Sequence, residues 1–132
     1  MTPENNILIV TPRMEELAAL CRSNTLIEAG LYREYDVKRG LRDVNGKGVL
    51  AGLTNISDII AQREVDGILQ PCPGELYYRG IRIEELVQGF VREGRKGYEE
   101  VAYLLLFGRL PDAKELGSFK SLLAQGRMLP TN

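Results

Sequence analysis

The chain has 132 residues, with 17 basic and 18 acidic side chains and a formal net charge of −1. This length suits one domain, and the balanced charge gives no electrostatic reason to expect a nucleic-acid or anionic-membrane partner. The sequence contains no histidine, which excludes a Ser-His or Cys-His nucleophile pair and an imidazole metal site within it.

The cysteine pattern and the first residues bear on location. Cys21 and Cys72 lie far apart and fit no metal-ligand spacing, so we expect free thiols in a reducing cytosol and no metal site. The longest apolar stretch near the N-terminus, Ile7–Val10, is too short for a signal peptide or a membrane span. The protein is therefore predicted to be cytoplasmic.

The first predicted element is a helix that opens at Thr11-Pro12, after a loose lead-in over residues 1–10. Threonine is a good N-cap, and proline suits the first helical position because its missing N–H needs no partner there. We expect Ser23-Asn24 to end the helix. Its apolar face is formed by Met14, Leu17, Ala18 and Cys21.

The next stretch predicts a short helix and then a β-hairpin. Leu31, Tyr32 and Tyr35 share one helical face after Gly30. Further on, Asn45-Gly46 is a strong tight-turn signal because both residues tolerate positive φ. Side chains over residues 49–54 alternate as in a strand, so we expect a hairpin around that turn.

Residues 56–78 are predicted to form a small, irregular β layer of short pieces. Ile56–Ala61 fits either a strand or a turn of helix, and Asp66-Gly67 marks a reversal. Pro71–Pro73 is expected to be a stiff loop, because proline cannot donate to the ladder of a central strand. Leu76–Tyr78 then resumes as a short strand.

Two amphipathic helices are predicted in the second half of the chain. The first has a clear apolar stripe and a C-terminal stop at Gly94. The second opens at Asp112, which forms a capping box with Glu115, and ends near Gly126. Gly117 lies inside it and indicates a close helix contact. The two apolar faces comprise Ile83, Leu86, Val87, Phe90 and Val91, and Leu116, Phe119, Leu122 and Leu123.

Between these helices lies the most apolar run of the chain, the seven residues Val101–Phe107. Gly97 as N-cap, acidic residues in the first turn and a stop at Gly108 favour a helix over a buried strand. A helix that is apolar on every side must be covered on every side. We therefore expect the other elements to pack around this helix.

Several of these stretches together resemble the citrate synthase family. Gly74–Gly80, reading GELYYRG, and the following Ile83–Leu86 resemble the amino-terminal signature of the family. Tyr98–Pro111 resembles the adjoining helix, and Gly40-Leu41-Arg42 resembles the Gly-Leu-Arg start. The resemblance covers about Gly40 to Pro130, with Asp112–Leu116 and Leu129-Pro130 also matching.

This resemblance implies a mainly α fold with a small irregular β layer, as the amino-terminal part of the all-helical citrate synthase fold. It divides the chain into an amino-terminal helical arm, residues 1–39, and a β-hairpin layer with the start of the large helical domain, residues 40–132. The complete protein would be a homodimer or a higher self-assembly, and it would condense acetyl-CoA, a substrate and not a cofactor, with oxaloacetate to citrate and CoA. No other cofactor is implied.

The family reaction uses an Asp to remove the methyl proton and two His residues to stabilise the developing oxyanions. These residues belong to the later part of the family sequence, so no catalytic residue is carried over to this chain. We therefore expect an amino-terminal piece of a longer polypeptide that is inactive alone. The alternatives are a naturally short protein that associates with a full-length synthase and regulates it, and a separate helical binding module.

One residue is a candidate substrate contact. Arg42 matches a position where some family members place an arginine near the phosphates of CoA, and a guanidinium offers paired donors to phosphate. The insert Asp43–Gly48 departs from shorter family versions and could displace it; a structural role is the alternative. Arg79, between tyrosines and a glycine, is predicted to be a structural residue that binds a carboxylate or a backbone carbonyl. The acyl specificity, acetyl-CoA or the propionyl-CoA of 2-methylcitrate synthases, stays open.

Overall fold

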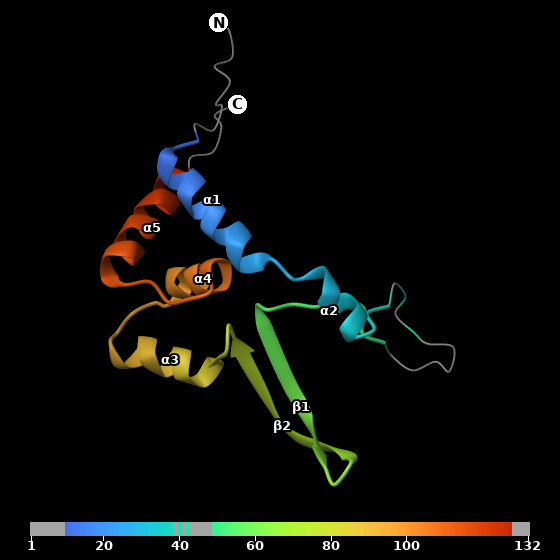
Figure 1. Ribbon diagram of the computed structural model, residues 1–132. Helices are drawn as coiled ribbons and strands as arrows, with labels where there is room; N and C mark the ends of the chain where they lie inside the picture. The colour runs from blue at the N-terminus through green and yellow to red at the C-terminus, as the bar shows by residue number, and fades with distance from the viewer. Residues whose placement is uncertain (1–9, 39, 41, 43–48, 128–132) are drawn as a thin grey trace, which may run out of the picture. The chain divides into compact units, whose positions relative to one another are not determined.

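The computed structural model describes residues 10–38, 40, 42 and 49–127. In chain order the elements are α1 (Pro12–Thr25), α2 (Ala29–Glu34), β1 (Ser57–Val65), β2 (Ile68–Tyr78), β3 (Ile81–Arg82), α3 (Ile83–Arg92), α4 (Tyr98–Phe107) and α5 (Ala113–Gln125) (Figure 1). Helices together with one small antiparallel sheet agree with the predicted class at this level. The predicted lead-in, residues 1–10, lies outside the described part except for Val10.

The chain divides into two compact units. The helical unit comprises Met1–Asn24 and Phe90–Asn132, and the ribbon unit comprises Thr25–Gly89. The boundary predicted from the sequence, after residue 39, concerns the domains of a complete enzyme and stays a prediction.

The core of the helical unit is aromatic. Its buried members are Leu17 of α1, Tyr103 and Phe107 of α4, and Phe119 of α5. The three rings meet edge to face, with centroid separations of 4.5 to 5.8 Å, the geometry that the ring quadrupoles favour. The amphipathic patterns of α1 and α5 were thus interpreted correctly at their central positions. Ala18, predicted on the same face of α1, is exposed.

The helix ends follow the local sequence signals. Thr11 Oγ1 accepts a hydrogen bond from Met14 N–H at 3.3 Å, which satisfies an otherwise unpaired donor of α1. At α5 the capping box is complete: Asp112 Oδ1 accepts from Glu115 N–H at 2.8 Å, and Glu115 Oε2 accepts from Asp112 N–H at 2.9 Å. The helix start predicted at Asp112 is therefore confirmed with its mechanism.

Glycines close α3 and α4 as predicted. Gly94 has φ +65°, and the N–H groups of Gly94 and Arg95 return to the carbonyls of Val91 and Phe90, the pattern of a Schellman stop. Gly108 has φ +79°, and a Cβ there would lie 2.6 Å from Asn24 Oδ1. Glycine at position 108 thus ends α4 and also admits the side chain at the end of α1.

Helix α4 is not covered on every side by the described residues. Tyr103 and Leu104 are each 1% exposed, whereas Leu106 remains 43% exposed. The described elements thus pack around part of this helix and leave apolar side chains such as Leu106 exposed. Gly117 of α5 also differs from its prediction, because a Cβ at this position would meet no described atom within 4 Å. Within the described residues, no close helix contact explains this glycine.

The ribbon unit is built on a long β-hairpin. Strands β1 and β2 pair antiparallel from Ser57 with Tyr78 to Val65 with Ile68, and β3 pairs with the last residues of β2. Asp66 and Gly67 both have positive φ, 52° and 77°, as the predicted reversal requires. The alternative of a helical turn at Ile56–Ala61 is wrong, since this segment enters β1.

The loop predicted at Pro71–Pro73 is wrong, because β2 runs through both prolines. Two features of the sheet explain this. The register with β1 shifts between Ile60 and Gln62, so part of β2 lies at a bulge, where proline is tolerated. In addition, on the edge of β2 that faces away from β1, β3 pairs only with Tyr77 and Tyr78. Among the described strands, none pairs with this edge at Pro71 and Pro73.

The segment that precedes the ribbon also differs from its prediction. The short helix predicted after Gly30 is confirmed as α2, which begins at Ala29 and so includes Gly30. Residues 49–54 are described and form no strand, although their side chains alternate. The turn at Asn45-Gly46, and with it the predicted hairpin, lies outside the described residues.

Candidate functional site

Arg42 is the residue that the sequence singled out for substrate binding. It is exposed and belongs to the ribbon unit. An exposed guanidinium is accessible to an anionic ligand, but the insert Asp43–Gly48 that follows lies outside the described residues. Its contact with CoA phosphate therefore stays a prediction.

Arg79 holds a turn together, as predicted. Its guanidinium donates to the backbone carbonyl of Asn55 at 3.3 Å and to Asn55 Oδ1 at 2.9 Å, and its own N–H donates to Ile56 O at 2.8 Å. Its φ of +49° is rare for a residue with a side chain. These bonds join the end of β2 to the segment before β1, a structural role.

A polar cluster lies on the β-hairpin. Glu75 accepts hydrogen bonds from Tyr77 Oη at 2.6 Å and from Arg63 Nη2 at 2.7 Å. The bonds from Tyr77 and Arg63 lower the pKa of the Glu75 carboxyl, and the carboxylate in turn raises the pKa of Tyr77. With its carboxylate bound by two donors, Glu75 is held ionised and is a poor candidate for a proton-transfer base.

A second polar cluster lies against the aromatic core of the helical unit. Arg109 donates to both oxygens of Glu115, at 2.8 and 2.5 Å, and its guanidinium carbon lies 5.8 Å from the centre of the Tyr103 ring. The bonds from Arg109 and from the N–H of Asp112 lower the pKa of Glu115 to about 2. Burial is the main reason that the pKa of Tyr103 is raised. The cluster is a fixed ion pair next to a buried phenol.

The sequence pattern predicts Glu115 only as the partner of Asp112 in a capping box, and its ion pair with Arg109 was not predicted. The signal was present, because an arginine six residues before the glutamate follows directly after the glycine stop of α4. A turn at that stop brings the guanidinium back over the first turn of α5. The spacing alone does not predict this ion pair, because only side chains three or four residues apart are neighbours on one helix, and Arg109 and Glu115 are six apart.

The described residues hold no group of three or more His, Cys, Asp and Glu side chains placed to bind a metal ion. Cys21 and Cys72 are not joined in a disulfide, and each is partly buried. Within the described part of the chain, none of the helices has both the length and the apolar character that a membrane span requires.

Comparison with known proteins gives the family. Residues 40–132 match the family model described as "Citrate synthase, C-terminal domain". A glyoxysomal citrate synthase of Cucurbita maxima is 32% identical over 78% of this chain and 19% of its own length. A citrate synthase of Saccharolobus solfataricus is 42% identical over 43% of this chain and 14% of its own. The 2-methylcitrate synthase 1 of Corynebacterium glutamicum is 33% identical over 64% and 17%.

The alignments with these three relatives thus span between 14% and 19% of the relatives' length. No solved structure gives a significant match. The family model covers well over half of the chain and includes α3, α4 and α5, the elements on which the resemblance was based. The chain belongs to the citrate synthase family.

Proposed function

We propose that this chain is the amino-terminal part of an acyltransferase that condenses acetyl-CoA with oxaloacetate to give citrate and free CoA. The observation that carries the proposal is the family match over residues 40–132, together with the similarity to citrate synthases. The helices α3 to α5 and their caps would serve as framework in this enzyme. The reaction itself would be performed by residues outside this chain.

The absence of histidine from this chain supports the proposal that the catalytic residues lie outside it. The family reaction needs imidazole groups to stabilise the developing oxyanions, and the 132 residues contain none. Glu75 and Glu115, the carboxylates with the best-defined partners, are held by arginines. Their lowered pKa values make them weak bases for removing a proton from carbon.

Arg42 would contribute to substrate binding rather than to the chemistry. A guanidinium binds phosphate oxygens with paired donors, so its role would be to hold the phosphates of CoA. Its exposure is compatible with that role. The complete enzyme would be a homodimer. Exposed apolar side chains on α3 and α4, such as Val91 at 72% and Leu106 at 43%, are available for burial by further protein surface.

The test compares the 132-residue chain with the polypeptide purified from its natural source. Each is incubated with acetyl-CoA and oxaloacetate, and free thiol is followed with a chromogenic reagent. We expect turnover by the natural polypeptide and none by the 132-residue chain. Turnover by the latter that survives repurification would contradict the location of the catalytic residues, whereas an inactive natural polypeptide would contradict the reaction itself.

A second candidate reaction uses propionyl-CoA and gives 2-methylcitrate. The observation in its favour is the 33% identity with a 2-methylcitrate synthase. The same assay decides between them when kcat/KM is measured for both acyl-CoA substrates on one preparation. A higher kcat/KM for acetyl-CoA than for propionyl-CoA supports the first proposal, and a lower one supports the second.

A further inference from the structure

The helical unit contains a cavity of about 400 Å³ between α1 and the segment that joins α4 to α5. Leu17, Ala19 and Leu20 of α1 form an apolar part of its wall. The remaining lining residues are polar, and they are Arg13, Glu16 and Ser23 of α1 together with Tyr103, Arg109 and Glu115. This volume and this mixture of an apolar wall with a few convergent polar groups are typical of small-molecule sites.

The acidic groups of the cavity are not equally available. Glu115 accepts two bonds from Arg109 and one from the N–H of Asp112, so most of its acceptor capacity is used. Glu16 is held by a single bond from Arg13 Nη1, 2.6 Å long, and its side chain is 69% exposed. Its carboxylate can therefore turn into water at little cost.

The basic groups, in contrast, retain unused donors. A guanidinium carries five N–H groups, and the side-chain bond found for Arg13 uses one of them. Arg109 is held in place by Glu115 and by the carbonyl of Leu110 at 3.2 Å, which leaves further N–H groups on a fixed fork. Both guanidiniums line the same cavity as the side chain of Tyr103.

We propose that this cavity binds a small organic carboxylate, with its charged head between Arg13 and Arg109 and a short apolar body against Leu17 and Leu20. The incoming carboxylate replaces Glu16 as the partner of Arg13. Planar guanidiniums match the geometry of a carboxylate, and burial of a hydrocarbon part against the apolar wall favours an organic carboxylate over an inorganic anion. The preformed pair of Arg109 and Glu115 keeps the polar wall rigid.

The test is an NMR titration of the chain with hexanoate, with butanoate and 1-hexanol as comparison probes. We expect hexanoate to shift the methyl signals of Leu17 and Leu20. Its affinity should exceed that of butanoate by about fourfold for each methylene buried, and that of 1-hexanol by tenfold or more.

The matched variants are Arg13→Met, which retains an unbranched side chain without charge, and Arg22→Met on the same helix, which does not line the cavity. Arg13→Met should weaken hexanoate binding tenfold or more, and Arg22→Met should leave it unchanged. An equal effect of both variants, equal binding of 1-hexanol, or no shift at Leu17 and Leu20 would overturn the proposal. Far-UV circular dichroism confirms that each variant is folded.

Discussion

Replacing Phe119 with leucine tests the edge-to-face aromatic contacts of the core. Phe119 is 5% exposed and makes two such contacts, at 5.4 Å with Tyr103 and at 5.8 Å with Phe107. Leucine keeps the site apolar but removes both ring pairs, and each pair contributes about 0.5–1.5 kcal/mol beyond its buried area. We therefore expect Phe119→Leu to lower the free energy of unfolding by about 1–3 kcal/mol.

The measurement is urea unfolding followed by circular dichroism, with the slope of the transition compared between variants. The matched control is Tyr98→Leu, an aromatic-to-leucine change at a side chain that is 73% exposed. This control should stay within about 0.5 kcal/mol of the parent. If Phe119→Leu shifts the midpoint no more than Tyr98→Leu does, at unchanged slope, the ring contacts do not stabilise the core as argued. Phe119→Ala is less informative, because a loss of about 3–5 kcal/mol approaches the whole stability of a small domain.

Three further predictions follow from single contacts. Asp112→Ala removes the acceptor of Glu115 N–H and should lower the free energy of unfolding by about 0.5–2 kcal/mol in the same urea experiment, whereas Asp112→Asn should lose less. The depressed pKa of Glu115, about 2 against an ordinary 4.5, stabilises the fold fully above pH 4.5 and no longer once the pH has fallen through about 2; the stability difference between the parent and Glu115→Gln should therefore be present at pH 7 and close over that range. In the active enzyme, Arg42→Ala should raise the KM for acetyl-CoA by roughly 10- to 150-fold and leave the KM for oxaloacetate unchanged; an unchanged KM for acetyl-CoA would leave Arg42 with a structural role.

The parts of the fold that the sequence predicted correctly are those fixed by local chemistry. The capping box of Asp112 and Glu115 acts within four residues, and Gly94 and Gly108 adopt the positive φ that their positions at helix ends require. Asp66-Gly67 likewise dictates its own turn. In each case the side chain and the backbone group that it satisfies are close in sequence, so the pattern itself contains the interaction.

The errors concern features that depend on a distant partner. The strand through Pro71 and Pro73 is possible only because the register of β1 shifts beside it and the opposite edge has no partner among the described strands. The alternation over residues 49–54 had no described partner strand to convert it into a ladder. A proline prevents a strand only where the N–H that it lacks would have bonded to a neighbouring strand. Alternating side chains likewise form a strand only where a neighbouring strand is present to pair with the backbone.

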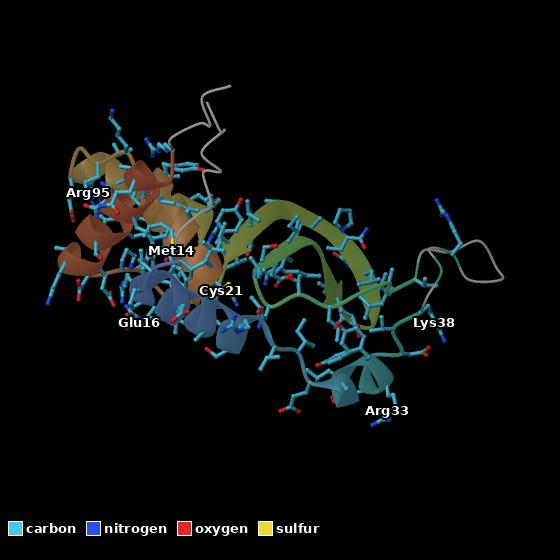
Figure 2. All side chains as sticks on the ribbon, turned by 90° about the horizontal axis from the view of Figure 1, so that it is seen from above. Met14, Glu16, Cys21, Arg33, Lys38 and Arg95 are labelled. Atoms are coloured by element: carbon cyan, nitrogen blue, oxygen red, sulfur yellow. The ribbon has the colours of Figure 1, made fainter. Side chains whose placement is uncertain are left out.

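The same distinction explains what was predictable about the functional residues. The family resemblance identified Arg42 through its place in a motif, which requires no knowledge of its neighbours. The cavity of the helical unit combines Arg13 and Tyr103, ninety residues apart, and it forms because α1 packs on α4 and α5 through Leu17. Figure 2 shows Met14, Glu16 and Cys21 on α1: the first and the last are half-buried, and Glu16 is exposed. The carboxylate site proposed at this face would thus depend on how the helices pack and not on a local sequence motif.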